Sequence, residues 1–368
     1  MASRSTATRW LDELTHLPTA SGHEDRVVAW VQKWAARRPD LKLSIDSGGN
    51  VLVTQKGRKS AAPVLAVAHM DHPAFVVTAV EGRDVEFEFR GGVNPEYFEA
   101  ARVVFTSETS GLSGVITEYD GESQQGKIRA NGPGVAVGDI ARWKLPKKSP
   151  SGDRFFAPAC DDLAGCVAAL AALDRMRGNA ALRHFGVLLT RAEEVGLVGA
   201  THSAKHATFP QNSRLLSIET SRASANAPIG DGPIIRVGDA VTIFDNELTN
   251  RISQGARRAG LRHQRKLMDG GGCEASAFVV YGYQATGLCL ALGNWHNRGN
   301  LDAFESGTGR PVPMLEEISL SDFHGLVELL QVACVAVDEE TGLKARFDDL
   351  YDNVGKFLSP RHPTRDQT

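Results

Sequence analysis

Four short and largely apolar runs, each followed closely by a histidine or a carboxylate, constrain the fold of this chain more than any other feature. They lie at 63–68, 185–190, 215–218 and 285–292. Their apolar residues stand at consecutive positions rather than at alternate ones, which is typical of strands covered on both faces in an α/β sheet. A further strand is predicted at 50–54.

Segments with helical periodicity surround these runs and supply the second layer of an α/β fold. Ser21 and Glu24 have the spacing of a capping box, which predicts that a helix begins at about residue 24. Helices are predicted up to about residue 17 and at 24–37, 162–176, 246–259, 275–281, 321–336 and 340–352, with a polar tail after the last one.

The pattern changes between residues 75 and 157, where no helical segment occurs. Short, β-rich and often alternating segments, separated by Gly, Asn, Asp and Pro, lie at 76–80, 85–89, 101–106, 114–118 and 139–143. Such a series is typical of a small all-β barrel or sandwich. We therefore predict an α/β fold with a mixed central sheet flanked by helices, in a discontinuous domain of residues 1–74 and 158–368, and an inserted barrel-like domain of residues 75–157.

Composition and charge narrow the range of functions. The 368 residues suit about two domains. A formal net charge of −3 gives no electrostatic basis for binding nucleic acid or an anionic membrane, so neither is an expected partner. No window approaches the roughly 20 apolar residues of a membrane span. The start of the chain lacks the apolar core of a secretory signal and the five cysteines lack CxxC spacing, so we expect a cytoplasmic, reducing location.

Acidic residues and histidines collect after the apolar runs and at one helix start. In chain order the set is His69, Asp71, Asp161, Asp162, Glu193, Glu194, Glu219 and His296. Because the carboxyl ends of the strands form the ligand-binding edge of an open α/β sheet, we expect these side chains to converge there. Singly, each residue also has an ordinary explanation, such as a helix cap, a solvated face or a core histidine.

The set as a whole is harder to explain without a ligand. Several carboxylates buried together would repel one another at a cost of several kcal/mol. Divalent cations remove that cost, and histidine with carboxylate is a ligand set suited to zinc, manganese or cobalt. The sequence therefore predicts a metal site at this edge of the sheet.

Sequence motifs connect these residues over nearly the whole chain. They are, in order, Ser21-Gly-His-Glu24, His69-Met-Asp71, Val137-Gly-Asp139, Asp161-Asp-Leu-Ala-Gly165, Glu193-Glu-Val-Gly-Leu-Val-Gly-Ala200, Gly230-Asp-Gly-Pro233 and Gly270-Gly-Gly-Cys-Glu-Ala275, before the strand that leads to His296. In order and spacing they resemble the tetrahedral-aminopeptidase family, co-catalytic metallopeptidases that include glutamyl and deblocking aminopeptidases. The β domain inserted between the first histidine and the first aspartate matches that family's architecture too.

The resemblance implies a role for each residue of the metal set. Asp161 would bridge two divalent metal ions, with His69 and Glu219 completing one and Glu194 and His296 the other. A bridging carboxylate and a bridging water suit ions about 3.5–4 Å apart. Zinc is the expected metal, with cobalt and manganese as alternatives.

Two further residues would serve the reaction. The resemblance implies that Glu193 is the general base that takes the proton of the metal-bound water, and that Asp71 orients the ring of His69. The implied function is an aminopeptidase that removes N-terminal residues from peptides. Its expected partners are peptide substrates and further copies of the same chain.

Several departures from the family pattern predict a divergent member. Glu219 stands where aspartate is usual, Leu163 replaces an arginine, and His72 stands where glutamate is typical. We expect the His72 imidazole at the surface rather than as an additional ligand. The contexts Cys273-Glu274-Ala275 and Trp295-His-Asn297 are also unusual, so the substrate side chain stays open.

Two other functions remain compatible with the residues. A related co-catalytic carboxypeptidase or amino-acid deacylase often has glutamate as its third ligand, but its extra domain usually follows the Glu-Glu motif. Here the insertion precedes Asp161 and is all-β, which favours the aminopeptidase. A non-catalytic binding protein on the same fold would be marked by loss of Glu193 or of Asp161, and both are present.

Overall fold

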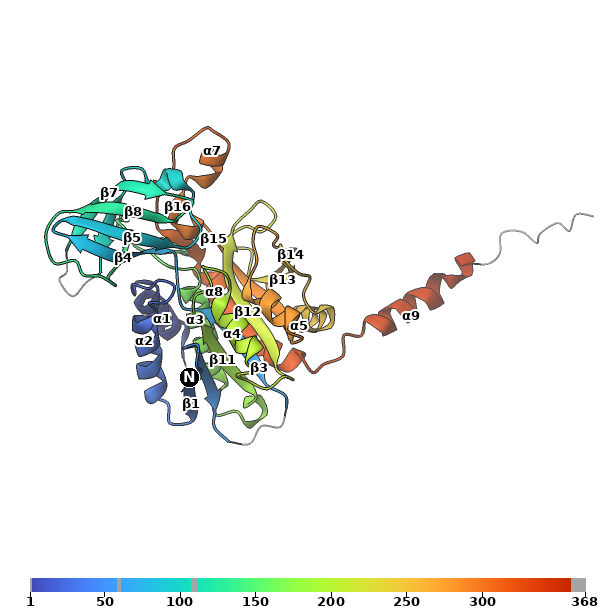
Figure 1. Ribbon diagram of the computed structural model, residues 1–368. Coiled ribbons are helices and arrows are strands. Elements are labelled where there is room, and N and C mark those ends of the chain that lie inside the picture. Colours follow the sequence, from blue (N-terminus) through green and yellow to red (C-terminus); the bar gives the residue numbers. More distant parts are fainter. Residues whose placement is uncertain (1, 58–60, 107–110, 359–368) are drawn as a thin grey trace, which may run out of the picture.

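The computed structural model describes residues 2–57, 61–106 and 111–358, and it confirms the mixed α/β fold with a barrel (Figure 1). One sheet of eight strands has the order β1-β2-β11-β3-β12-β15-β13-β14. Its strands are, in that order, Leu41–Ile45, Val51–Gln55, Phe185–Thr190, Val64–His69, Arg214–Arg222, Gln284–Leu292, Ile234–Gly238 and Gln264–Leu267. The four apolar runs form the adjacent parallel strands β11, β3, β12 and β15.

Alternate residues of these strands face two different hydrophobic cores. In β3, Ala66 and Ala68 belong to one core, and Leu65 and Val67 belong to the other. Helices on the first face are α1 (Arg4–Thr15), α2 (Asp25–Ala36), α3 (Leu163–Met176), α5 (Asn246–Arg258) and α8 (Leu320–Ala336). On the second face they are α4 (Val198–Lys205) and α6 (Glu274–Val280).

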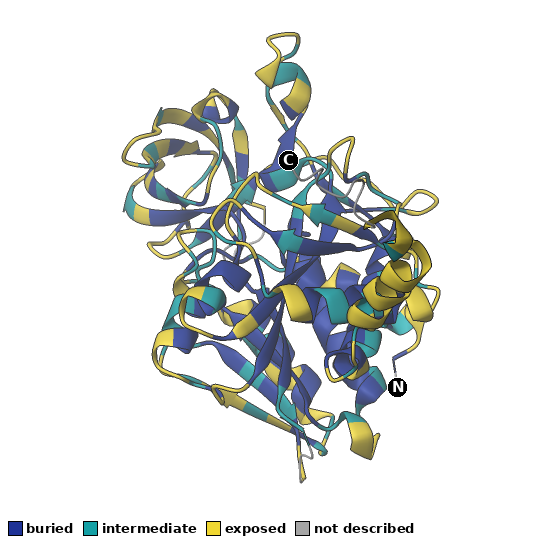
Figure 2. Ribbon diagram, turned by 90° about the vertical axis from the view of Figure 1, so that its right-hand side faces the viewer, coloured by how far each residue is buried: buried dark blue, intermediate teal, exposed yellow. Residues whose placement is uncertain are grey.

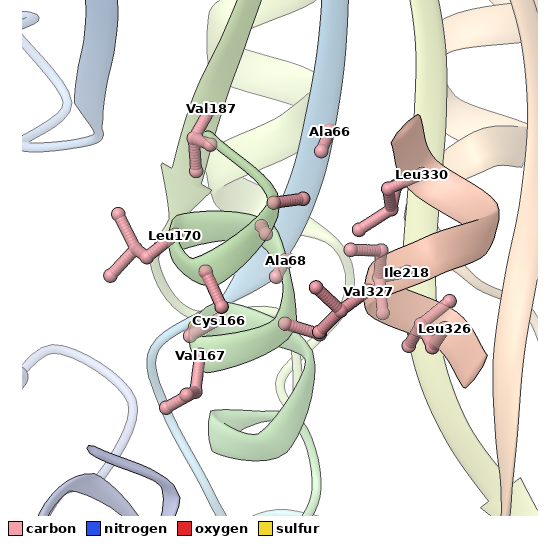
Figure 3. Close-up of a cluster of buried hydrophobic side chains, with 14 of the residues drawn as sticks. Ala66, Ala68, Cys166, Val167, Leu170, Val187, Ile218, Leu326, Val327 and Leu330 are labelled. Atoms are coloured by element: carbon pink, nitrogen blue, oxygen red, sulfur yellow. The ribbon is translucent and has the colours of Figure 1, made fainter. Parts of the chain in front are cut away.

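Figure 3 shows how tightly the first face is covered: side chains of α3 and α8 pack against Ala66 and Ala68, whose small size lets the helices approach the strand. The central strands are consequently buried over most of their length (Figure 2). This double burial explains why their sequences are apolar at consecutive positions.

A closed barrel of six strands, in the order β4-β5-β8-β7-β6-β9, interrupts the chain between β3 and α3. The strands are β4 (Ala74–Glu81), β5 (Asp84–Arg90), β6 (Arg102–Phe105), β7 (Ser113–Asp120), β8 (Gln125–Ala130) and β9 (Ile140–Trp143). Its core is aromatic. Phe75 lies edge-on to the rings of Phe87, Phe89, Phe98 and Trp143, with ring centroids 4.8 to 5.8 Å apart.

Strand β8 is a member of the barrel that the sequence pattern did not predict. Only Ile128 and Ala130 of its residues are buried, so its alternation is too weak to separate it from a loop. Pairing with β5 and β7 on its two sides, rather than its own composition, makes it a strand.

Two short antiparallel pairs lie outside the central sheet and the barrel. Strand β10 (Arg154–Ala157) pairs with β18 (Glu316–Ser319), which precedes α8. The short ribbon of β16 (Arg298–Gly299) and β17 (Val312–Pro313) carries α7 (Leu301–Glu305), and Leu301 packs into the barrel core. The division at residues 74/75 and 157/158 stays a prediction.

The last described helix, α9 (Leu343–Val354), stands away from the body and contains no buried residue (Figure 1). A short 3₁₀ turn, Gly355–Leu358, follows it. Most of the predicted polar tail falls on 359–368, outside the described residues. Among the helices that the structure describes, none is both long and apolar enough to cross a membrane.

The aromatic core of the barrel gives a first test of this fold. Because Phe75 is fully buried among four other rings, we expect Phe75→Ala to lower the free energy of unfolding by about 3–5 kcal/mol. Urea unfolding followed by tryptophan emission measures the change. The exposed Phe357 is the matched control, and Phe357→Ala should change the free energy by less than about 0.5 kcal/mol. Equal effects of the two substitutions would contradict the assigned barrel core.

Candidate metal centre

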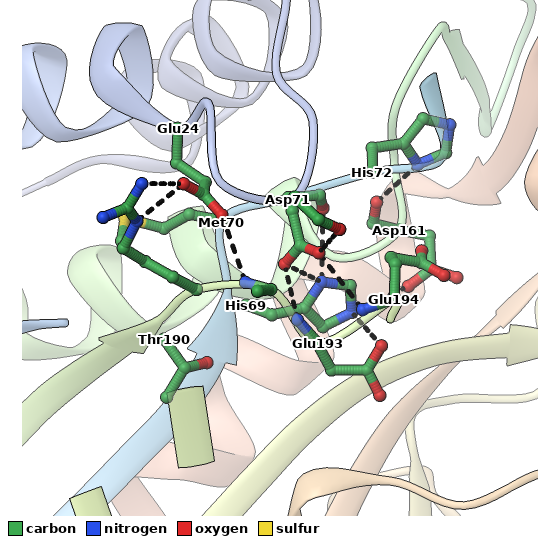
Figure 4. A network of polar contacts seen from close by, with 12 residues as sticks. Glu24, His69, Met70, Asp71, His72, Asp161, Thr190, Glu193 and Glu194 are labelled. Carbon is green, nitrogen blue, oxygen red and sulfur yellow. Dashed lines mark hydrogen bonds and ion pairs between the residues drawn. The ribbon is translucent and has the colours of Figure 1, made fainter. Parts of the chain in front are cut away.

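The histidines and carboxylates of the predicted metal set converge at the carboxyl edge of the central strands, and Figure 4 shows His69, Asp161 and Glu194 among them. His69 is the last residue of β3, and Glu193 and Glu194 lie in the loop after β11. His296 follows β15 in the 3₁₀ turn Trp295–Asn297. Asp161 precedes α3.

Glu219 reaches the same place by a different route from the one predicted. Strand β12 does not end at residue 218 but runs to Arg222, so Glu219 lies inside it, level with Cys289 of β15. The neighbouring strand β3 pairs with β12 only as far as Ser217. The longer strand therefore carries Glu219 just past the last β3–β12 pair, beside the end of β3.

Asp161 lies between the two histidines. Its Oδ1 is 3.3 Å from Nε2 of His69, and its Oδ2 is 3.5 Å from Nε2 of His296. Glu219 approaches the first ring, with Oε1 3.6 Å from Nε2 of His69. Glu194 approaches the second, with Oε2 3.2 Å from Nε2 of His296. The two oxygens of one carboxylate thus face two different histidines, each with its own second carboxylate.

Buried oxygens without partners show that the cluster suits a cation. Asp161 Oδ1 and Glu194 Oε1 are both buried and accept no hydrogen bond from any described residue. Such atoms are costly unless a metal ion or a proton satisfies them.

Two groups of three ligand atoms lie within 4.8 Å of one another: His69 with Asp161 and Glu194, and His69 with Glu193 and Glu219. Both groups share His69 and neither includes His296, so grouping by proximity alone does not reproduce the two implied ligand sets. The pairwise distances to the two imidazole rings do separate them. A bridging ligand is defined by which group each of its oxygens faces, and the two oxygens of Asp161 face different rings.

The electrostatics of the cluster follow from burying acids and bases together. Burial alone would lower the pKa of His69, but the surrounding carboxylates, Glu193 first, raise it well above its usual range. Burial also tends to raise the pKa of Asp161, whereas the neighbouring His296 and His69 hold it well below its usual range. Burial, helped by the charge of Asp161, raises the pKa of Glu219 to about 7. The cluster without a cation therefore retains protons near neutral pH.

Asp71 fastens several parts of this centre at once. Its Oδ1 lies 3.4 Å from Nδ1 of His69 and accepts the backbone N–H of Glu193 at 3.0 Å. Its Oδ2 accepts the backbone N–H of Glu194 at 3.1 Å and the hydroxyl of Ser21 at 2.6 Å. One fully buried carboxylate thus contacts the His69 ring and also holds the loop that carries the two glutamates.

The capping box expected at Ser21 and Glu24 is wrong. Helix α2 begins at Asp25 without a side-chain cap, and the Ser21 hydroxyl donates to Asp71 instead. Glu24 accepts hydrogen bonds from Gly22 N, Ala192 N and the guanidinium of Arg191, at 2.8, 3.1 and 2.6 Å. Both side chains therefore anchor the segment between α1 and α2, Ser21 to Asp71 and Glu24 to the loop after β11.

The surface position expected for His72 is wrong as well. The ring is buried, with Nδ1 2.7 Å from the backbone oxygen of Asp161 and Nε2 3.2 Å from Oδ1 of Asn297. His72 holds the backbone of Asp161, and its sequence position beside Asp71 gave no sign of this contact between segments 89 residues apart.

Glu316 is a buried residue of the centre that the motifs did not identify. It lies on β18 and accepts backbone N–H groups of Cys160, Asp161 and His296, at 2.7, 3.0 and 2.8 Å. In sequence it looks like one of two glutamates before a helix. Only the pairing of β18 with β10 brings it to the site.

A cavity of about 900 Å³ opens beside the cluster. Glu193, Glu194 and His296 line it near the histidines, and Arg236 and Lys266 line it farther along β13 and β14. Arg236 is almost fully buried, with hydrogen bonds to Ser221 Oγ at 3.2 Å and Met268 O at 3.1 Å. The cavity is large enough for an amino-acid side chain and part of a peptide.

Two findings together define the class of this protein. One is the histidine and carboxylate cluster at the carboxyl edge of a mixed sheet, with a barrel inserted before Asp161. The other is a match to a known family. The family profile described as M42 glutamyl aminopeptidase matches residues 49–131 and 122–301. The chain belongs to this family, which confirms the resemblance to the tetrahedral aminopeptidases. It is accordingly a hydrolase, a metal-dependent aminopeptidase.

Solved structures agree on the fold. An aminopeptidase from the archaeon Desulfurococcus kamchatkensis is 24% identical, with a TM-score of 0.74 over 92% of this chain and 96% of its own. A TET aminopeptidase from a marine-sediment Thaumarchaeota archaeon is 21% identical, with a TM-score of 0.74 over 90% of this chain and 99% of its own. The TET1 peptidase of Pyrococcus horikoshii is 22% identical, with a TM-score of 0.71 over 89% of this chain and 99% of its own.

The protonated state of the cluster leads to a pH-dependence that can be measured. A divalent cation must displace protons from the histidines and from Glu219, whose pKa is raised to about 7. We therefore expect zinc affinity to fall at least about tenfold as the pH is lowered from about 8 to about 6. Titration calorimetry with a competing chelator measures this affinity. An affinity independent of pH over that range would contradict the assignment of these groups to the metal centre.

Proposed function

We propose that the chain binds two divalent metal ions and uses Glu193 as general base to remove N-terminal residues from peptides. The observation that carries this proposal is the placement of Asp161, whose two oxygens face two different histidines at 3.3 and 3.5 Å. A carboxylate in that position suits a bridge between two cations.

The ligand sets follow from the same distances. His69 and Glu219 would complete one metal position, and His296 and Glu194 the other, with Asp161 shared. Zinc is the metal we expect from this mixture of imidazole and carboxylate, with cobalt and manganese as alternatives. When bound, such ions polarise the scissile carbonyl and lower the pKa of an attacking water.

Two observations support proton transfer, rather than metal ligation, as the role of Glu193. Its side chain lines the cavity. Its Oε2 lies 3.9 Å from Nε2 of His69, the longest of the four distances between a carboxylate and that ring. Asp71 fixes the Glu193 backbone, so the carboxylate is held at the cavity wall. There it would take the proton of the attacking water and deliver it to the leaving amine.

A substitution separates these two kinds of role. Glu193→Gln keeps the shape of the side chain but removes the base, so we expect kcat to fall by about 10²–10⁴ with both metal ions retained. Hydrolysis of aminoacyl-anilides, with metal content measured on the same sample, gives both numbers. The exposed Glu340 offers a matched control, since Glu340→Gln should leave both unchanged. Undiminished turnover of the Glu193 variant with full metal content would remove Glu193 from this role.

The cavity favours an acidic residue at the substrate's N-terminus, in agreement with the family description of a glutamyl aminopeptidase. Arg236 is a buried cation on the cavity wall, and its guanidinium donates hydrogen bonds to Ser221 Oγ at 3.2 Å and Met268 O at 3.1 Å. Lys266 adds a second positive charge along the same wall. A substrate carboxylate could reach the guanidinium and form charge-assisted hydrogen bonds with it.

This preference makes a prediction on substrates. Arg236→Met keeps the length and the packing of the side chain but removes its charge. We expect kcat/KM for a glutamyl-anilide to fall by about tenfold or more, with little change for a leucyl-anilide. Arg346→Met, at an exposed position of α9, is the control. Equal losses on both substrates would indicate a structural effect and contradict the proposed preference.

The aminopeptidase function also separates this chain from the related hydrolases. It predicts cleavage of peptides with a free α-amine, including C-terminally blocked ones, and no cleavage of N-acylated ones. The Pyrococcus TET1 peptidase assembles into a tetrahedron or a large octahedral shell. We expect this chain to form a homo-oligomer too, in the cytoplasm.

A further inference from the structure

We propose that Trp295 and Glu316 are positioning residues that fix Asp161 and His296 relative to each other and thereby create the second metal position. The inference rests on the proposed two-metal centre. Trp295 and Glu316 belong to neither ligand set, and the sequence motifs imply no role for them.

The backbone around His296 has an unusual conformation. Asn294, His296 and Asn297 all have positive φ angles, of 54°, 57° and 59°. Asparagine and histidine adopt this left-handed conformation more often than most residues, but each non-glycine residue there still costs of order 1–3 kcal/mol. The conformation needs contacts from the surrounding chain that hold it in place.

Glu316 supplies the contact that joins this turn to Asp161. Its Oε1 accepts the backbone N–H of His296 at 2.8 Å, and its Oε2 accepts the backbone N–H of Asp161 at 3.0 Å and that of Cys160 at 2.7 Å. The carboxylate is completely buried. One side chain thus fixes the separation of the bridging aspartate and the second histidine.

Trp295 acts on the Asp161 side chain itself. Its indole N–H donates to Asp161 Oδ2 at 3.0 Å, the oxygen that lies 3.5 Å from Nε2 of His296. A carboxylate oxygen has two lone pairs, so one can accept the indole while the other stays open to a cation. The bond fixes the direction in which Oδ2 presents that second lone pair.

The ring of Trp295 is itself held in position. The guanidinium of Arg298 lies 4.3 Å from the ring centroid, a cation–π contact. Arg298 in turn donates to Oδ1 of Asn94, which precedes the 3₁₀ turn of the barrel insert, at 2.8 Å. His296 also has its ring oriented from that side, with Nδ1 2.8 Å from the backbone oxygen of Gly92.

These contacts are distributed unequally between the two metal positions. Asp161 Oδ1, which faces His69, accepts no hydrogen bond within the described part of the chain, whereas Oδ2 accepts the indole. Glu316 bonds to the backbone of His296, while His69 ends strand β3 and is held by the sheet. Both positions share Asp161, but the sheet holds the histidine of the position beside Glu219, whereas Glu316 holds the histidine of the position beside Glu194. The second position therefore depends more on Trp295 and Glu316 than the first.

Metal titration of the purified full-length chain, stripped of metal, tests this dependence. Trp295→Phe keeps the ring but removes the N–H, and Glu316→Gln leaves one acceptor oxygen for three N–H groups. For both variants we expect one of the two zinc affinities to fall about 10–100-fold, and the other to change by less than about threefold. Calorimetry with chelator competition measures both affinities without reference to turnover.

Two matched controls separate positioning from general damage. Trp30→Phe removes an indole N–H that donates to the Glu13 carboxylate, far from the site, and Glu317→Gln changes the neighbouring glutamate that pairs with Arg154. Both controls should bind zinc as the parent chain does. If Glu316→Gln fails to fold, Trp295→Phe alone decides the question.

The outcomes are distinguishable. Unchanged zinc affinities in Trp295→Phe, or equal losses at both positions, would overturn this inference while leaving the two-metal centre intact. A parent chain that binds one zinc ion or none would instead overturn the proposed centre itself. A loss of affinity confined to one of two zinc ions supports both the inference and the two-metal centre.

Discussion

The contact of one carboxylate, Asp161, with two histidines is the interaction on which the rest of the site depends. Two imidazoles and several buried carboxylates occupy one edge of the sheet. The mutual repulsion of the carboxylates would oppose folding unless cations or protons compensate it. Asp161 stands between the two halves of this cluster, with one oxygen toward each. The roles of the other residues follow from which half they contact.

Three further buried carboxylates hold the segments of the centre rather than its ligand atoms. Asp71 fixes the Glu193–Glu194 loop, Glu24 fixes the residues before it, and Glu316 fixes the backbones of Asp161 and His296. All three are fully buried and accept hydrogen bonds from main-chain N–H groups. Backbone donors thus compensate these three carboxylates, while Asp161, Glu194 and Glu219 stay available for metal.

The sequence predicted those parts of the molecule that depend on local pattern. Consecutive apolar residues identified the four central strands, and the residues that follow them, such as His69, were found because strand ends meet at one edge. Contacts between distant segments escaped that reasoning. Glu316 reaches the site only through the β10–β18 pair, and His72 is buried because Asp161 and Asn297 surround its ring.

Strand β8, Ser21 and Glu219 show the same limit. The polar pattern of β8 hid a strand that its neighbours define, and Ser21 has the spacing of a helix cap but bonds to Asp71 across the fold. Glu219 was expected after a strand that ends at residue 218, but pairing with β15 extends that strand to Arg222. In each case a tertiary partner decided between conformations that the local sequence left open.

The most direct test of the account is anomalous X-ray diffraction from crystals grown with zinc. Two anomalous peaks about 3.5–4 Å apart, one beside each oxygen of Asp161, are the predicted result. A single peak, or peaks that do not flank Asp161, would contradict the bridging role from which the assignment of the site is built.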